Sequence, residues 1–114
     1  MELTVRIKGH NKSEQKQLVQ QMLDLLVEGH VGAKLENFVT EHFPQAEEAL
    51  EKMLDAFEEQ SGMNLELHEF YPGTDGKFLL CFLGGYQLED IVPKIVCWLE
   101  LCGISDIQVE QSWV

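Results

Sequence analysis

Basic residues are scarce in this sequence. Its 114 residues include 8 lysines and arginines against 20 aspartates and glutamates, and the formal net charge at pH 7 is −12. The imbalance is uneven, because residues 1–34 carry a net charge of +1 and residues 35–114 carry −13. Proteins hold nucleic acids through lysine and arginine contacts to phosphates, so we expect no direct binding of DNA or RNA. A strongly acidic surface favours a basic protein partner instead.

Long apolar runs, an export signal and paired cysteines are also missing. The longest apolar run covers residues 78–83, far fewer than the roughly 18 residues of a membrane-spanning helix. The first ten residues alternate polar and apolar types, where a signal peptide has a continuous apolar stretch. The three cysteines, Cys81, Cys97 and Cys102, form no CxxC pair and are odd in number. We therefore expect no membrane association, reduced thiols and a cytoplasmic location.

Motifs for metals, cofactors and nucleophiles are lacking as well. The four histidines form no HxxxH or HExxH pattern. No cysteine lies beside basic residues or at the start of an expected helix, where a thiolate would be favoured. The Gly84-Gly85 pair belongs to neither a GxGxxG fingerprint nor a P-loop. We therefore predict no metal, no cofactor and no catalytic residue, and an enzyme is the less favoured class.

The residues that are present indicate an ordinary folded domain. Apolar residues make up 45% of the chain and charged residues 25%, and neither glycine nor proline is in excess. A chain of this length buries enough apolar surface to form one core. No internal repeat, linker or low-complexity tract divides it. We therefore predict a single α+β domain over residues 1–114.

Alternation of apolar and polar residues predicts most of the strands. The expected strands comprise residues 3–8, 63–68, 77–83 and 107–113. Residues 71–76 are rich in turn formers, so we expect a hairpin loop there. The strand over residues 77–83 is apolar on both faces, which is typical of a central strand covered on both sides.

Apolar residues at helical spacing predict the helices. We expect one helix before Gly29, one over residues 33–43, one from Pro44 to the Ser61-Gly62 pair, and one that begins near Glu89 or Asp90 and ends at Gly103. Pro93 would then lie in the first turn of the last helix, where proline is tolerated. This order of elements predicts a ferredoxin-like split βαβ fold, with an antiparallel sheet and extra helices inserted before the second strand.

One face of the helix that begins at Pro44 is almost purely acidic. Opposite its apolar stripe lie the carboxylates of Glu47, Glu48, Glu51, Asp55 and Glu58, with Lys52 as the only base. Such a pattern is ordinarily interpreted as a solvated face. The more specific interpretation is a docking surface for a basic protein partner. We therefore favour a small acidic interaction or regulatory protein that is not an enzyme. An inhibitor or immunity-type protein is the narrower version of this hypothesis.

A small-molecule-binding sensor or a small enzyme is the alternative. Its site would lie near the loops at residues 71–76 and 84–86, where a glycine pair follows a strand and precedes a helix. Backbone N–H groups in such a turn gather around anions. The candidate ligand-binding residues are Tyr71, Asp75, Gly84, Gly85 and Tyr86.

The strand over residues 77–83 needs a cover on its second face. Either the extra helices provide that cover or a second subunit does. A homodimer, formed through this face or through an exposed edge strand, is therefore a further prediction.

Overall fold

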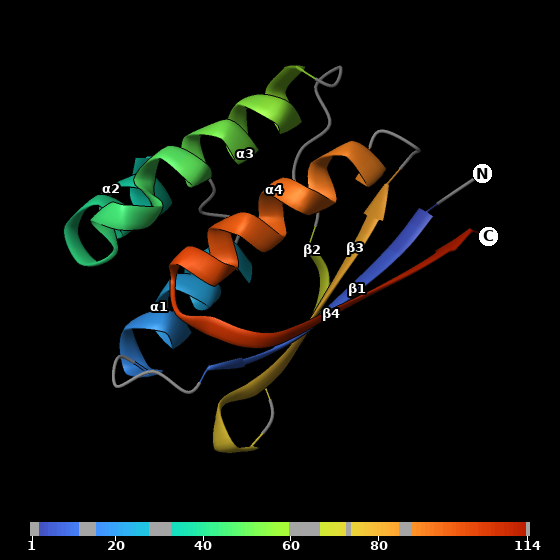
Figure 1. Cartoon of the computed structure of the whole chain (residues 1–114), viewed down its shortest axis with the longest axis horizontal. Helices are drawn as coiled ribbons and strands as arrows, with labels where there is room; N and C mark the ends of the chain where they lie inside the picture. The colour runs from blue at the N-terminus through green and yellow to red at the C-terminus, as the bar shows by residue number, and fades with distance from the viewer. Residues whose placement is uncertain are drawn as a thin grey trace.

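An antiparallel sheet forms one side of the molecule in the computed structural model (Figure 1). The structure describes residues 3–11, 16–27, 33–59, 67–72, 74–84 and 88–113. The strands within them are β1 (Leu3–Asn11), β2 (Leu67–Pro72), β3 (Lys77–Gly84) and β4 (Ile104–Trp113). Their order across the sheet is β2-β3-β1-β4, and every neighbouring pair is antiparallel. The predicted α+β class with an antiparallel sheet is confirmed.

The helices pack on one face of the sheet in two layers (Figure 1). The layer next to the sheet consists of α1 (Lys16–Val27) and α4 (Leu88–Leu101). The second layer consists of α2 (Ala33–His42) and α3 (Glu47–Glu59), which contact α1 and α4. The extra helices therefore cover the first helix layer and not the second face of the sheet. No helix in the described ranges is long and apolar enough to cross a membrane.

The sheet face turned toward α1 and α4, here called the inner face, is apolar. Successive side chains of a strand point to opposite faces, and this alternation places Leu3, Val5 and Ile7 of β1 on the inner face. All three are fully buried. Burying one aliphatic side chain of this size contributes about 1.5–3 kcal/mol, so the inner face supplies a large share of the stability.

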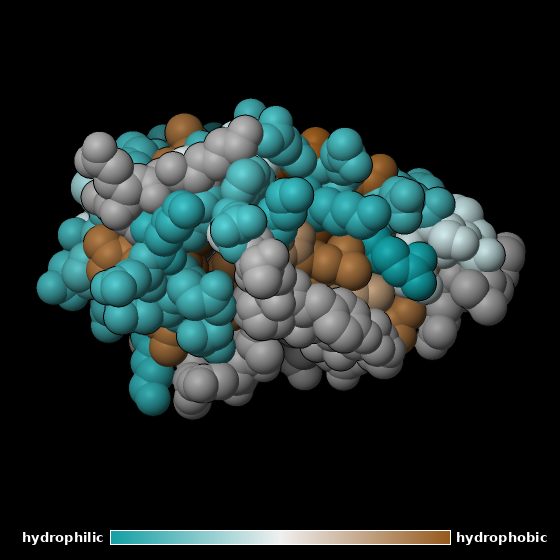
Figure 2. All heavy atoms as spheres, turned by 90° about the horizontal axis from the view of Figure 1, so that it is seen from below, coloured by the Kyte–Doolittle hydropathy of each residue, from teal (hydrophilic) through white to brown (hydrophobic). Residues whose placement is uncertain are grey.

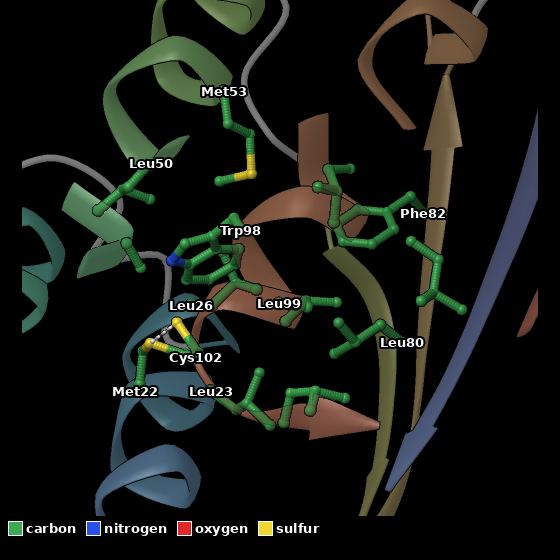
Figure 3. Close-up of a cluster of buried hydrophobic side chains, with 14 of the residues drawn as sticks. Met22, Leu23, Leu26, Leu50, Met53, Leu80, Phe82, Trp98, Leu99 and Cys102 are labelled. Carbon is green, nitrogen blue, oxygen red and sulfur yellow. Dashed lines mark hydrogen bonds between the residues drawn. The ribbon is translucent and has the colours of Figure 1, made fainter. Parts of the chain in front are cut away.

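Trp98 of α4 lies at the centre of the helix layers. It is fully buried, and Figure 3 shows it among Leu50 and Met53 of α3 and Leu26 of α1. The predicted apolar stripe of α3 thus docks on α4. The indole Nε1 of Trp98 has no hydrogen-bond partner in the described part of the chain, which costs about 1–3 kcal/mol that the surrounding apolar contacts offset.

Gly9 lets β1 extend further than predicted. The sequence predicts a strand over residues 3–8, but β1 continues to Asn11, with a bulge opposite β4 between Lys8 and His10. A Cβ atom at Gly9 would lie 2.7 Å from Ile104 Cγ2 and 2.7 Å from Phe78 Cζ. The glycine therefore permits close packing in mid-strand and does not end the strand.

The second strand ends later in the chain than predicted. It covers Leu67–Pro72, whereas the predicted strand covers residues 63–68, of which residues 63–66 lie outside the described residues. The predicted loop over residues 71–76 is correspondingly shorter, with a turn at Thr74–Gly76. Pro72 is compatible with a strand here because β2 is an edge strand with β3 as its one neighbour.

The prediction for Pro93 is wrong in one respect. α4 begins at Leu88, so Pro93 lies inside the helix and past its first turn. Proline cannot donate a hydrogen bond to the carbonyl of Glu89, four residues earlier. Both residues are exposed, so water can satisfy that carbonyl. By contrast, Pro44 lies at the first position of its 3-10 turn, as expected.

Candidate functional site

The predicted docking residues lie on the solvent side of α3. Leu50 and Met53 are buried on the side that packs against α4. The exposed side carries the carboxylates of Glu47, Glu48, Glu51 and Asp55. Glu58 also belongs to α3, but its side chain lies outside the described part of the structure.

Few cations neutralise this side of α3. Lys52 pairs with Glu48, with 3.3 Å between Nζ and Oε1. Both side chains are largely exposed, so the pair contributes only about 0.3–0.5 kcal/mol. Glu47, Glu51 and Asp55 form no ion pair within the described residues. Most of the negative charge on α3 is therefore uncompensated.

A groove of about 190 Å³ between α2 and α3 extends the acidic area. Glu36 of α2 lines it together with Glu47 and Glu51 of α3, and Asn37 and Thr40 add an amide and a hydroxyl group. We call Glu36, Glu47, Glu48, Glu51 and Asp55 the acidic surface. Carboxylates and neutral acceptors in one groove match the donors of a lysine or arginine side chain.

Two of the predicted ligand-binding residues, Asp75 and Gly84, lie at opposite ends of β3. Asp75 lies in the turn before β3, whereas Gly84 is the last residue of β3. At about 3.3 Å per residue, the strand separates them by roughly 23 Å. Tyr71 lies in β2, opposite Leu79 in the register, and Gly85 and Tyr86 lie outside the described residues. One ligand of ordinary size cannot contact both Asp75 and Gly84.

The second face of the sheet, here called the outer face, gathers basic side chains. Alternation in β1 places Arg6, Lys8 and His10 on it, and Lys77 of β3 pairs with His10 in the register. The three long cations are exposed. Figure 2 views the molecule from below and shows hydrophilic residues with fewer hydrophobic ones between them on the described part of that surface. No helix of the described chain covers this face (Figure 1).

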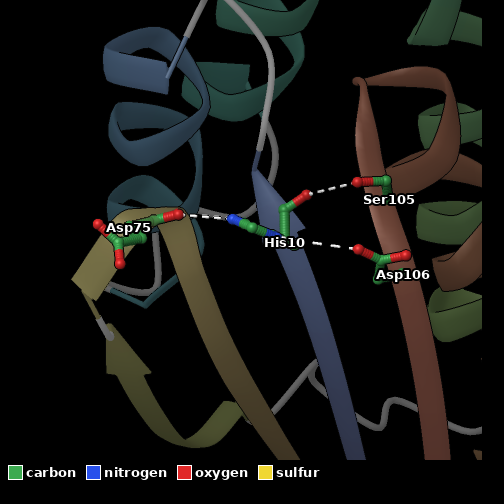
Figure 4. Close-up of polar contacts among 4 residues, drawn as sticks. All are labelled: His10, Asp75, Ser105 and Asp106. Atoms are coloured by element: carbon green, nitrogen blue, oxygen red, sulfur yellow. Dashed lines mark hydrogen bonds and ion pairs between the residues drawn. The ribbon is translucent and has the colours of Figure 1, made fainter.

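A hollow of about 490 Å³ lies on the outer face where β1, β3 and β4 meet. His10 lines this hollow, and Figure 4 shows it between Asp75 and Asp106. Its Nε2 lies 2.6 Å from the carbonyl oxygen of Asp75, and its Nδ1 lies 3.9 Å from Asp106 Oδ2. The hydroxyl of Ser105 donates to the His10 carbonyl at 3.2 Å. His10 is thus fixed by contacts from the turn before β3 and from β4.

The backbone at both of these contacts is unusual. Asp75 and Asp106 have φ angles of 58° and 54°, and they are the non-glycine residues with positive φ among those described. Aspartate tolerates this region better than most residues, at a cost of about 1–2 kcal/mol. Such outliers persist where the surroundings hold them and cluster at functional sites.

The residues around His10 were missed at the sequence level. One signal was present, because the alternation that buries Leu3, Val5 and Ile7 also places Arg6, Lys8 and His10 on the opposite face. No pattern in the sequence indicates that Lys77 and Asp106 lie beside His10. They depend on the register of strands separated by more than sixty residues of chain, as in the 65-residue separation of His10 and Asp75.

Metal-binding and nucleophilic groups give no second site. In the part of the chain that the structure describes, no three histidine, cysteine, aspartate or glutamate side chains are grouped to hold a metal ion. Burial raises the pKa of the Cys102 thiol from 9.0 to about 12, and its Sγ lies 3.7 Å from Met22 Sδ. The neutral thiol is therefore the form present at physiological pH.

Comparison with known proteins places the chain in no family. No family model matches the sequence, no curated protein matches it, and no solved structure matches its fold at the level taken as significant.

Proposed function

We propose that this protein is an interaction or regulatory protein, not an enzyme, that binds a basic protein partner through the acidic surface. The observation that carries the proposal is the exposed carboxylates of Glu47, Glu51 and Asp55, which have no cation partner among the described residues. Like charges four residues apart on a helix destabilise it by about 0.2–0.5 kcal/mol per pair. Glu47 lies in the first turn of α3, where a carboxylate stabilises the helix, but Glu51 and Asp55 lie beyond that turn. A partner is therefore a reason for the carboxylates of Glu51 and Asp55.

The groove between α2 and α3 supports contact with lysine and arginine side chains. A basic side chain placed there would lie between Glu36 on one helix and Glu47 or Glu51 on the other. Hydrogen bonds between such charged groups are roughly twice as strong as neutral ones. The net charge of −12 would also accelerate the encounter, and salt would weaken that effect.

An inhibitor or immunity-type protein is the narrower form of this proposal. Such a protein would mask a basic nucleic-acid-binding enzyme by presenting carboxylates where phosphates otherwise bind. A neighbouring gene that encodes a basic nuclease or toxin would support this form, and a neighbourhood without one would remove its support.

The test compares two variants with the same change in net charge. Glu51→Gln with Asp55→Gln removes two carboxylates from the acidic surface. Glu89→Gln with Glu100→Gln removes two exposed carboxylates from α4 and is the matched control. Each protein is used at low salt to capture partners from cell extract, and a captured protein is then purified and its dissociation constant measured over a range of salt concentrations.

We expect the wild type and the control to bind one basic protein with similar affinity and the acidic-surface variant to bind it about tenfold more weakly. The dissociation constant should rise with salt for all three. An equal loss of affinity in both variants would mean that only the net charge matters, and the absence of any salt-sensitive protein partner would contradict the proposal itself.

We further propose that the fold is the ferredoxin-like split βαβ arrangement, with α2 and α3 as an insertion. The strand order β2-β3-β1-β4 supports it, as does the antiparallel pairing of each neighbouring pair. The connections β1-α1 and β3-α4-β4 place both sheet-packed helices on one face, which is the layer arrangement of that fold.

Homodimerisation remains a prediction, and β4 is the element that supports it best. β4 lies at the edge of the sheet, and its side chains from Gln108 to Trp113 are exposed. An edge strand offers unpaired N–H and C=O groups to a second strand. Symmetric pairing through the outer face is less favoured, because it would bring Arg6 and Lys8 of two copies together. Sedimentation at several protein concentrations tests this prediction.

A further inference from the structure

The hollow beside His10 has the size and the composition of a small-molecule site. Its volume of about 490 Å³ lies within the roughly 300–1,000 Å³ of typical ligand pockets. Lys8, His10, Lys77 and Gln108 contribute polar groups, and Leu79 adds apolar surface between them. This site lies on the outer face of the sheet, so it is independent of the acidic surface on α3.

Two ammonium groups flank the hollow from adjacent strands. Lys77 is opposite His10 in the register and Lys8 is opposite Leu79, so the two lysines are diagonal neighbours on one face. Residues in this relation lie about 7–8 Å apart, close enough for both long side chains to reach one bound group. Neither lysine forms an ion pair within the described residues.

Asp106 also lines the hollow, and its carboxylate oxygen Oδ2 lies 3.9 Å from His10 Nδ1. His10 in turn is anchored at Nε2 by the Asp75 carbonyl, and its own carbonyl accepts from Ser105. The centre of the hollow is therefore fixed before any ligand arrives. Fixed polar groups bind with a smaller loss of side-chain entropy than mobile ones.

The balance of charges selects the kind of anion. The hollow carries two ammonium groups and the carboxylate of Asp106. A phosphate monoester, with a charge of about −1.5 to −2 at pH 7 and three acceptor oxygens, can contact both ammonium groups at once, whereas a carboxylate offers one charge and two acceptor oxygens. Lysine binds phosphate well as a point charge. A nucleic acid strand is disfavoured, because its further phosphates would meet a protein of net charge −12. The apolar surface of Leu79 is suited to a small organic body attached to the phosphate.

We propose that the hollow formed by Lys8, His10, Lys77 and Gln108 is a binding site for a small phosphate monoester. The two ammonium groups hold the phosphate, the amide of Gln108 donates a hydrogen bond, and the organic part of the ligand lies over Leu79. This proposal extends beyond the docking function, and either one can fail without the other.

The test is a titration of the ¹⁵N-labelled full chain followed by NMR at constant ionic strength. Four probes are added separately: ribose 5-phosphate, inorganic phosphate, acetate and ribose. We expect saturable shifts confined to the amides of Lys8, His10, Lys77, Gln108 and their neighbours with ribose 5-phosphate. Inorganic phosphate should bind more weakly, and acetate and ribose should give no saturable shifts.

Charge-matched variants locate the site. Lys8→Gln with Lys77→Gln should raise the dissociation constant for ribose 5-phosphate by about tenfold or more, because charged hydrogen bonds are lost. Lys34→Gln with Lys94→Gln removes two exposed lysines from α2 and α4 and should leave it unchanged. The thermal unfolding of all variants is recorded to confirm that each is folded.

Three outcomes would overturn the proposal. Equal weakening by both lysine pairs would show that only the net charge is sensed. Equal affinity for inorganic phosphate and ribose 5-phosphate would assign the hollow to free phosphate. Shifts at these residues that depend on protein concentration without any ligand would assign it to the acidic surface of a second copy.

Discussion

The two faces of the sheet come from the same strands but have opposite environments. On β1, Val5 and Ile7 are fully buried against the helices, while Arg6 and Lys8 between them are exposed to solvent. The cause is the two-residue period of a strand, which sends neighbouring side chains to opposite faces. The comparison teaches that stability comes mainly from the inner face, whereas the outer face presents Arg6, Lys8 and Lys77 to solvent.

The largest expected change in the free energy of unfolding is at Leu80 of β3, and its neighbour Leu79 is the comparison. Leu80 is fully buried on the inner face, whereas Leu79 lies on the outer face and is only partly buried. Leu80→Ala should lower the free energy of unfolding by about 2–5 kcal/mol, because it leaves a cavity. Leu79→Ala should lower it by about 1 kcal/mol or less. Urea unfolding measures both, and similar losses would mean that the outer face is covered in solution.

A smaller loss of stability is expected when an added methyl group overpacks the inner face. Gly9→Ala would place a methyl group 2.7 Å from both Ile104 Cγ2 and Phe78 Cζ, and overpacking of this kind costs about 1–3 kcal/mol. Adding Phe78→Leu removes one of the two clashes and should recover part of the loss. If Gly9→Ala unfolds at the wild-type urea concentration, the strands are not packed as closely as described.

The buried side also makes stability sensitive to alkaline pH. Burial raises the pKa of Cys102 from 9.0 to about 12, so the folded state keeps this proton where the unfolded state loses it. Stability is therefore complete below pH 9 and falls as the pH rises toward 12. By pH 10 the loss should be about 1.4 kcal/mol.

The measurement is the free energy of unfolding at pH 8 and pH 10 for the wild type and two variants. Cys102→Ala should remove this loss, whereas Cys97→Ala, which removes an exposed thiol, should retain it. The same pH dependence in all three proteins would show that Cys102 is not its source.

The smallest effect is expected on the outer face and on the acidic surface. Lys8→Gln with Lys77→Gln should change the free energy of unfolding by no more than about 0.5 kcal/mol, because neither lysine has an ion pair among the described residues. Glu51→Gln with Asp55→Gln should leave the free energy of unfolding unchanged or raise it by about 0.2–0.5 kcal/mol. A large drop in either variant would make these charges structural, and the separation of stability from binding would fail.

Elements with a strong period were predictable from the sequence. The apolar stripe of α3 was clear, and of its leucines Leu50 is buried and Leu54 is partly buried. The end of β2 was placed too early, because Tyr71-Pro72 has the composition of a turn and nothing local shows that an edge strand will accept it. Local pattern thus predicts the type of an element better than its ends.

The two candidate surfaces differed in how far they were predictable. The acidic residues of α3 lie on one helix, so their spacing alone places them together. The hollow requires β1, β3 and β4 to align so that Lys8, Lys77 and Gln108 meet. That alignment depends on the whole core, and in particular on Gly9, which no short stretch of sequence reveals.

The two tryptophans supply an optical signal for each region. Trp98 has no exposed surface and lies between the helix layers, whereas Trp113 is 44% exposed on β4. An apolar surrounding shifts indole emission to the blue, and water shifts it to the red. Acrylamide should therefore quench the red part of the emission first, and a partner that covers β4 would protect that part alone. The two tryptophans are thus intrinsic fluorescent probes, Trp98 for the interior and Trp113 for β4.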